Sequence, residues 1–237
     1  MDNAVGVLGG LGPMATIYFC ELVLSMTRAE RDQDHVNMII LNHAAIPDRT
    51  AYILKESGES PLPFMIDDAL RLETAGAKFI VIPCNTAHYF IDEVKKNVSV
   101  PVLDIVRETV KEAKRRFPGM KRLGVLATDG TIITNTYKRA CEEEGVEYAV
   151  PDESVQKEVM SLIYDKIKAG EKPEARELER LIDHMREKGC RCTVLGCTEL
   201  SVAKRDCGIS DGDVVDSLEV LAMRTIERAG KEIRIKS

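Results

Sequence analysis

Residues 79–86 read FIVIPCNT, a short apolar run that ends in a cysteine followed by small polar residues. A similar stretch, TVLGCTE, stands at residues 193–199. Short, uninterrupted apolar runs rich in β-branched residues are typical of buried strands in parallel sheets. The two copies therefore predict two equivalent strands, each with a cysteine, Cys84 or Cys197, directly after its carboxyl end.

Two further stretches recur in the same order. GVLGG at residues 6–10 returns as GVLAT at 124–128, and VPVLD at 100–104 returns as DVVD at 213–216. The three pairs are offset by 118, 113 and 112 residues, so the second half keeps the spacing of the first apart from small changes in loop length. One short apolar match is readily produced by chance, but three in register predict an internal duplication.

Composition limits the kinds of partner. The chain has 237 residues, 44% of them hydrophobic, which is enough for two modest cores. Its net charge of -6 comes from 33 basic and 39 acidic residues that are well mixed, which disfavours nucleic acid and a charged membrane surface as partners. No apolar run approaches the roughly 18 residues of a membrane span, and the N-terminus lacks a signal-peptide pattern. We expect a soluble, cytoplasmic protein with a small-molecule partner.

Short apolar stretches alternate with longer helical ones, which predicts parallel βαβ units. The fold class that follows is α/β: two similar Rossmann-like domains with parallel-rich sheets, related by pseudo-twofold symmetry, with the active site in the cleft between them. We expect residues 1–115 to form the first domain, completed by the C-terminal helix 217–237, and residues 116–216 to form the second. The expected strands lie at 4–8, 36–41, 78–82, 100–103, 122–126, 147–150, 192–195 and 213–215, and the expected helices at 13–30, 62–75, 86–97, 105–116, 131–144, 152–169, 173–188 and 217–229.

The two strand-end cysteines are the first candidates for chemistry, because ligands of open α/β sheets bind beyond the carboxyl ends of the strands. The residues after Cys84 and Cys197 offer capping side chains and free backbone N–H groups, a setting that lowers the pKa of a thiol. The alternative is a buried structural cysteine, since free cysteine is among the most buried residue types. We prefer that alternative for four other cysteines: Cys20, Cys141, Cys190 and Cys192.

The cysteine count indicates neither a disulfide framework nor a metal. Seven cysteines form an odd set without a secretory signal, so we expect reduced thiols. No Cys-x-x-Cys pair occurs, and no histidine stands at zinc-finger spacing. These patterns predict no metal, and they disfavour a thiol redox protein.

Glycine-rich and hydroxyl-rich loops follow the first strand of each half. GGLGPMAT at residues 9–16 brings backbone amides close to a ligand, but it only partly matches a dinucleotide fingerprint, which makes a nicotinamide cofactor a weak alternative. The equivalent loop, ATDGT at residues 127–131, has hydroxyls and amides suited to a carboxylate. Both loops favour an anionic small molecule.

Three motifs together, GGLGP at 9–13, PCNTAH at 83–88 and GCTE at 196–199, resemble the aspartate racemases of the cofactor-independent aspartate/glutamate racemase superfamily. The resemblance covers essentially the whole chain. It implies a pseudo-symmetric two-domain enzyme, commonly a homodimer, that racemises an amino acid without pyridoxal phosphate or metal. It also implies that Cys84 and Cys197 are the catalytic pair. Inverting a stereocentre through a planar carbanion needs a base on one face and an acid on the other, so one thiolate and one thiol are required at once.

The same resemblance implies substrate-binding residues. Arg49 and Lys168 match the family's cations, which suit a dicarboxylate, and Lys166 is an alternative to Lys168. For both Arg49 and Lys168 the other interpretation is a solvated surface charge. Met14 is expected to line the cleft, with core packing as the alternative. Hydroxyls and amides can stabilise the charge that develops on the α-carboxylate, and the candidates are Asn85, Thr86, Thr128 and Thr198.

The preferred function is therefore an aspartate racemase, with glutamate as a second candidate substrate. Discrimination between the two depends on one methylene, worth only about 1 to 3 kcal/mol, which the sequence does not resolve. One alternative is a relative that acts on another amino acid, a hydantoin or maleate. Another is an amino-acid-binding module without turnover. Roles for His88, Asp104 and Asp216 stay open.

Overall fold

The computed structural model of the chain describes residues 3–210 and 212–234, which form two compact units. The first unit comprises the residues up to Ile105 together with those from Leu218 onward, and the second is Val106–Ser217. The divisions expected from the sequence lie after residues 115 and 216, and the end of the expected 217–237 segment, residues 235–237, lies outside the described residues. That each half is a domain in its own right stays a prediction.

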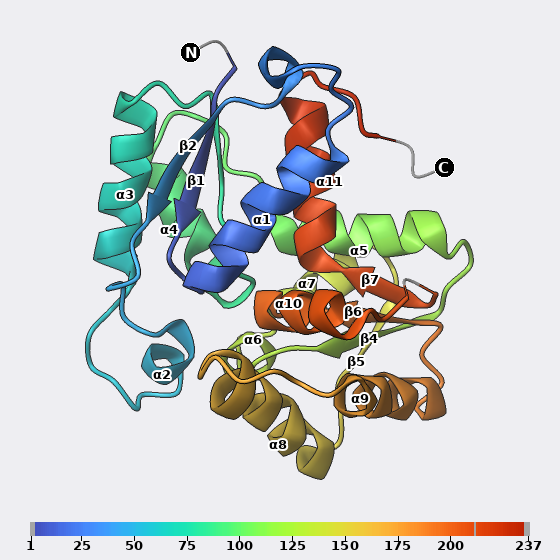
Figure 1. Cartoon of the computed structure of the whole chain (residues 1–237). Coiled ribbons are helices and arrows are strands. Elements are labelled where there is room, and N and C mark those ends of the chain that lie inside the picture. The colour runs from blue at the N-terminus through green and yellow to red at the C-terminus, as the bar shows by residue number, and fades with distance from the viewer. Residues whose placement is uncertain (1–2, 211, 235–237) are drawn as a thin grey trace. The chain divides into compact units, whose positions relative to one another are not determined.

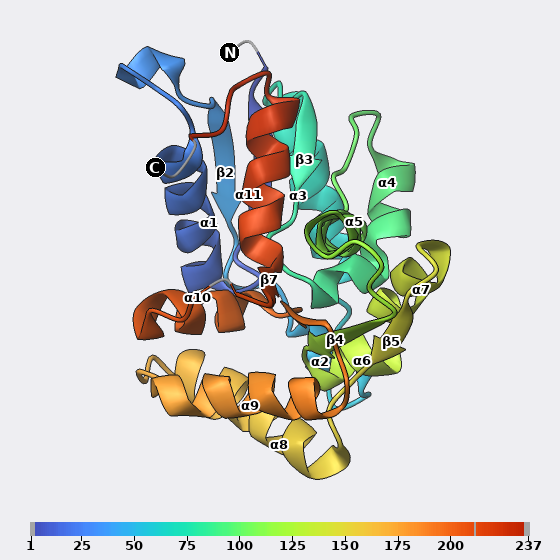
Figure 2. The same ribbon diagram turned by 90° about the vertical axis from the view of Figure 1, so that its right-hand side faces the viewer.

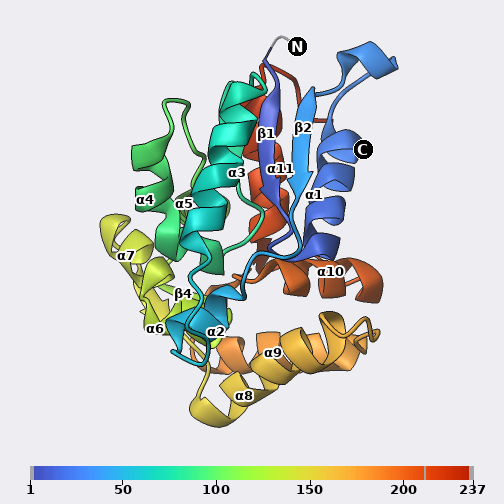
Figure 3. The same ribbon diagram turned by 90° about the vertical axis from the view of Figure 1, so that its left-hand side faces the viewer.

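The first unit contains a parallel three-stranded sheet in the order β2-β1-β3, formed by β1 (Val5–Gly9), β2 (Met38–Asn42) and β3 (Phe79–Val81). Strands β1 and β2 are neighbours in Figure 1. Helices α3 (Leu62–Thr74) and α4 (Ile91–Asn97) cover one face of this sheet, and α1 (Pro13–Met26) and α11 (Ser217–Arg228) cover the other (Figure 3). Because side chains alternate along a strand, Leu8 and Ile80 reach the core formed with α3 and α4.

The second unit contains a parallel four-stranded sheet in the order β5-β4-β6-β7, formed by β4 (Arg122–Leu126), β5 (Glu147–Ala149), β6 (Cys192–Leu195) and β7 (Val214–Asp216). Helices α8 (Glu153–Ser161) and α9 (Ala175–Glu187) lie side by side (Figure 2), and their apolar residues enter one core with β6. Apart from its first residue, the helix α5 (Ile105–Arg116) belongs to this unit. These two parallel sheets confirm the predicted α/β class.

The two sheets share a strand order, except that the fourth strand of the first sheet is reduced to one bridge. Residues 101–103 run beside β3: Ile80 N donates to Pro101 O at 2.8 Å, and Leu103 N donates to Ile80 O at 2.9 Å. Only the pair Ile80 and Val102 forms a bridge. The strand expected at 100–103 is therefore wrong as a full strand, because Pro101 has no N–H with which to continue the ladder.

Several expected helices are divided or extended differently. The segment expected at 131–144 is split into α6 (Asp129–Ile133) and α7 (Thr136–Glu143), because Asn135 adopts a left-handed φ of 54° between them. The segment at 86–97 begins as a 3₁₀ helix, Thr86–Phe90. The segment at 152–169 ends in a π-helix, Leu162–Ile167. Three elements were not expected: α2 (Arg49–Ile53), α10 (Thr198–Cys207) and a 3₁₀ turn at Asp32–Asp34.

Within residues 3–210 and 212–234, no helix combines the length and apolar character that crossing a membrane requires.

Candidate active site

The loop after β1 requires glycine at two positions. A Cβ on Gly9 would lie 2.3 Å from Thr16 Cγ2, and one on Gly10 would lie 2.3 to 2.4 Å from backbone atoms of His43. Gly10 also has φ +85°, a conformation that favours glycine. Its N–H donates to Thr16 Oγ1 at 3.0 Å. The loop therefore packs tightly between the end of β2 and the first turn of α1.

Arg49 is a buried cation at the same edge of the first sheet. It opens α2, whose N-cap Asp48 accepts a hydrogen bond from Ala51 N at 2.9 Å. The guanidinium donates to Leu11 O at 2.7 Å and to Pro47 O at 3.0 Å. Its Nε is buried without a partner, and among the described residues no carboxylate pairs with it. An arginine that is 6% exposed and has no counter-ion among the described residues is suited to bind an anion.

Cys84 lies directly beyond β3 and is buried. Its N–H donates to Ile82 O at 2.8 Å across Pro83, which turns the chain away from the sheet. The 3₁₀ helix that follows packs against α2, where the Tyr52 and Phe90 rings lie 5.9 Å apart. Arg49 thus connects the segments that follow β1 and β2, and the contact between Tyr52 and Phe90 connects them to the segment that follows β3 and contains Cys84.

His88 braces the Cys84 segment. Its Nδ1 donates to Cys84 O at 2.8 Å, and its Nε2 accepts from Ile105 N at 3.2 Å. Burial lowers the pKa of His88, and the nearby charge of Asp104 offsets this only in part. The imidazole is therefore neutral with its proton on Nδ1.

The other candidates in the first unit differ in burial. Asn85 and Thr86 are buried, but Asn85, the N-cap of the 3₁₀ helix, makes no capping hydrogen bond, so the expected capping there is wrong. Met14 is 60% exposed at the start of α1, which makes core packing the wrong alternative for it.

Cys197 occupies the matching place in the second unit, between β6 and α10, and is buried. Its Sγ lies 3.0 Å from Glu199 Oε2 and donates to it. Burial, the Glu199 charge and this hydrogen bond raise the pKa of Cys197 well above the ordinary thiol value, while Lys168 lowers it. The expectation of a lowered pKa is wrong for Cys197, because burial and a carboxylate outweigh the helix terminus.

The second unit contains two candidate threonines: Thr198 follows Cys197, and Thr128 lies in the loop after β4 that corresponds to the glycine-rich loop after β1. Thr198 is buried, and its hydroxyl is directed at Glu199 Oε2, 3.4 Å away. Thr128 is also buried and caps α6: its Oγ1 accepts from Thr131 N at 3.3 Å. Capping is thus found at Thr128, where none was expected, whereas the N-cap of α10 is Cys197 itself, without a side-chain capping bond, so the capping expected after Cys197 is wrong.

The structure distinguishes the two candidate lysines. Lys166 forms an ion pair with Glu177 of α9. Lys168 Nζ lies 4.0 Å from the centre of the Tyr164 ring, and its charge acts on the Cys197 thiol. The π-helix Leu162–Ile167 ends directly before Lys168, whose N–H donates to Ile163 O at 3.0 Å, and such bulges are frequent at functional sites.

The remaining cysteines fit the structural interpretation. Cys141, Cys190 and Cys192 are buried, and Cys20 is partly exposed. Burial raises the pKa of Cys141 and of Cys192 to about 12, which leaves both thiols unreactive. Within the described part of the chain all seven cysteines are free, and no cluster of metal-ligating side chains occurs.

Two residues with clear contacts to the cysteines were not among the predicted site residues. Glu199 carries a signal in the sequence, since it stands two residues after Cys197. No signal in the sequence indicates that His88 links Cys84 to Ile105, because only the tertiary structure brings Ile105 to the His88 ring.

Comparison with known proteins identifies the class. The model of the Asp/Glu/Hydantoin racemase family matches residues 8–225. The broad specificity amino-acid racemase RacX of Bacillus subtilis is 29% identical over 228 residues, which cover 94% of this chain and 96% of that protein. The glutamate racemase of Aquifex pyrophilus is 30% identical over 173 residues, which cover 70% of this chain and 65% of that enzyme.

Solved structures agree. Picrophilus torridus aspartate racemase superposes with a TM-score of 0.83 at 30% identity, covering 98% of this chain and 96% of that one. An aspartate racemase homologue from Pyrococcus horikoshii OT3 gives a TM-score of 0.76 at 26% identity, covering 96% and 99%. This chain belongs to the Asp/Glu/hydantoin racemase family. It is an amino-acid racemase, and therefore an isomerase.

Proposed function

We propose that this protein interconverts L- and D-aspartate without pyridoxal phosphate, with Cys84 and Cys197 as the two acid–base groups. The observation that carries the proposal is their matched placement: each is a buried cysteine in the loop that follows the carboxyl end of a corresponding strand, β3 or β6. The prediction that both act in one cleft between the halves is part of this proposal.

In the proposed reaction, the thiolate of one cysteine removes the α-proton of the substrate and becomes a thiol. The electron pair of the broken C–H bond is left on a planar carbanion conjugated with the α-carboxylate. The thiol of the other cysteine then donates its proton to the opposite face and becomes a thiolate. The reverse reaction exchanges the two roles. Hydroxyl and amide groups that stabilise the developing carboxylate charge are assigned to Asn85, Thr86, Thr128 and Thr198.

The preference for a dicarboxylate is supported by two cations. Arg49 is buried without an acidic partner among the described residues, so a substrate carboxylate would supply its missing counter-charge. Lys168 is the second cation, since its charge acts on Cys197. Met14, exposed at the start of α1, is assigned to the lining of the site.

Aspartate is preferred because a solved aspartate racemase matches nearly the whole chain at 30% identity. A broader or different substrate range is the second candidate, since a relative of similar coverage is named a broad specificity amino-acid racemase and other relatives are glutamate racemases. The homodimeric state and the cytoplasmic location stay predictions, and sedimentation of the purified protein would test the first.

The test is to incubate purified, reduced protein with L-aspartate in deuterated buffer, without added cofactor. Loss of the α-proton is followed by NMR and the enantiomers by chiral chromatography, and the assay is repeated with glutamate. We expect exchange and D-aspartate from the wild type and loss of racemisation in Cys84→Ser and Cys197→Ser. Cys20→Ser serves as the matched control with full activity. No exchange by the folded wild type would reject aspartate turnover, and tight aspartate binding without exchange would favour a binding module.

A further inference from the structure

We propose that Glu199 is a positioning residue that keeps the exchangeable proton on Cys197, so that the resting enzyme holds its thiol on Cys197 and leaves the thiolate role to Cys84. This inference rests on the proposed two-cysteine reaction. It adds the assignment of which cysteine starts as the acid.

The Glu199 carboxylate contacts the Cys197 thiol directly. Glu199 Oε2 lies 3.0 Å from Cys197 Sγ, and a carboxylate oxygen at that distance accepts from a thiol but repels a thiolate. Both side chains are buried, at 7% and 5% exposure, so bulk water does not screen the interaction. The thiol is thus the form of Cys197 that this carboxylate stabilises.

The second argument concerns the charge of Glu199. Among the described residues no cation forms an ion pair with it, and the Thr198 hydroxyl lies 3.4 Å from the same carboxylate oxygen. No ion pair among the described residues therefore competes with the thiol for this carboxylate. Lys168 is the charged group that acts in the opposite direction on Cys197.

The third argument comes from comparing the two halves. Cys84 and Cys197 correspond in the duplicated sequence, so the position equivalent to Glu199 is Thr86, which carries no charge. The duplication supplies two similar thiols, and Glu199 makes them unequal. A pair that must hold one proton between two sulfurs needs such an inequality to have a defined resting state.

The inference is tested by alkylation, which does not depend on turnover. Wild type, Glu199→Gln, Glu199→Asp and Glu177→Gln are given short pulses of iodoacetamide over a series of pH values, and modification of each cysteine is measured by peptide mass spectrometry. Glu177→Gln is the matched control, because it removes a glutamate of the same unit that pairs with Lys166 instead of contacting Cys197.

In the wild type we expect the pH at which alkylation of Cys197 is half-maximal, its alkylation midpoint, to lie above the ordinary thiol pKa of about 8.5. Glu199→Gln should lower that midpoint by about one pH unit or more, whereas Glu199→Asp and Glu177→Gln should stay closer to wild type and Cys84 should not shift. An unchanged midpoint in Glu199→Gln, or an equal shift in Glu177→Gln, would overturn the inference. If Glu199→Gln does not fold, a wild-type midpoint for Cys197 at or below 8.5 would overturn it.

This result is separable from the proposed function. Failure of the wild type to racemise aspartate would reject the substrate but leave the alkylation midpoints unaffected. If racemisation is present, the alkaline limb of its pH profile should move to lower pH in Glu199→Gln, since Cys197 then loses its proton earlier. An alkaline limb that stays in place while the Cys197 midpoint moves would overturn the assignment of Cys197 as the resting acid.

Discussion

His88 holds the Cys84 carbonyl: the ring Nδ1 lies 2.8 Å from Cys84 O and donates to it. The other ring nitrogen accepts from the backbone of Ile105, so one neutral imidazole connects the cysteine segment to the start of α5. Because His88 is the fourth residue after Cys84, it braces the backbone beneath the thiol, and the position of Cys84 depends on the ring being uncharged.

The first prediction concerns acid stability. Since burial lowers the pKa of His88 in the folded state, the unfolded chain binds a proton near pH 6.5 that the folded chain does not. The contribution of His88 to stability is therefore present above pH 6.5 and is lost as pH falls from there toward the lower folded pKa. Urea denaturation at several pH values should show this loss in the wild type. His88→Gln should be less stable at neutral pH by about 1 to 3 kcal/mol and lose less stability over that window. Equal losses in both proteins would contradict the assignment.

The second prediction concerns Arg49. Arg49→Lys keeps a positive charge but cannot form the bidentate contact or all of the carbonyl bonds, so KM for aspartate should rise by about tenfold or more. Steady-state kinetics with both enantiomers would measure it, with circular dichroism as a check of folding. A folded Arg49→Lys enzyme with unchanged KM would show that the guanidinium supports only the backbone of its loop.

The third prediction separates the two lysines. Lys168→Met removes the cation that lowers the pKa of Cys197, so kcat/KM for aspartate should fall by about tenfold and the Cys197 alkylation midpoint should rise. Lys166→Met is the matched control: it removes a partly exposed ion pair with Glu177, worth about 0 to 1 kcal/mol, and should leave the kinetics close to wild type. Equal effects of the two substitutions would argue against a specific role for Lys168.

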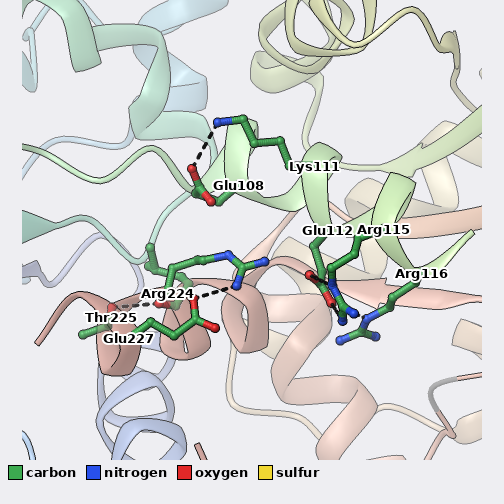
Figure 4. A network of polar contacts seen from close by, with 9 residues as sticks. Glu108, Lys111, Glu112, Arg115, Arg116, Arg224, Thr225 and Glu227 are labelled. Carbon is green, nitrogen blue, oxygen red and sulfur yellow. Dashed lines mark hydrogen bonds and ion pairs between the residues drawn. The ribbon is translucent and has the colours of Figure 1, made fainter. Parts of the chain in front are cut away.

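The fourth prediction concerns stability away from the site. Glu112 of α5 is buried, and its carboxylate accepts hydrogen bonds from Arg115 Nη2 at 2.7 Å and from Arg116 Nε at 2.9 Å (Figure 4). Burial opposes its charge, but the hydrogen bonds from both arginines outweigh burial and lower its pKa to about 2. Its contribution is therefore complete above the unfolded pKa of about 4.5 and is lost as pH falls from there to about 2. Glu112→Gln should cost about 1 to 3 kcal/mol at pH 7, and the cost should shrink toward pH 3. A cost that is the same at both pH values would exclude the charge as its cause.

Local patterns explain how much of the fold was predictable. Short, largely apolar stretches marked the strands of the two sheets, most clearly β1, β3 and β6, which are buried along their whole length and so need apolar side chains on both faces. The predicted boundaries of elements were wrong where a single residue changes the backbone conformation. Pro101 prevents a full strand, and Asn135 divides a helix. Helix α10 was not predicted because its first two turns are buried on all sides, so the sequence lacks the amphipathic period that predicts a helix.

The sequence by itself determined the duplication, the α/β class and the placement of a cysteine after a matching strand in each half, since these depend on short-range periodicity and spacing. Only the tertiary structure decided the chemical state of those residues. It showed that Glu199 raises the pKa of Cys197, that His88 is held neutral, and that Arg49 is buried with no acidic partner among the described residues. The physical reason is that a pKa depends on burial and on the charges within a few ångströms, which are set by how the chain packs and not by the residue type.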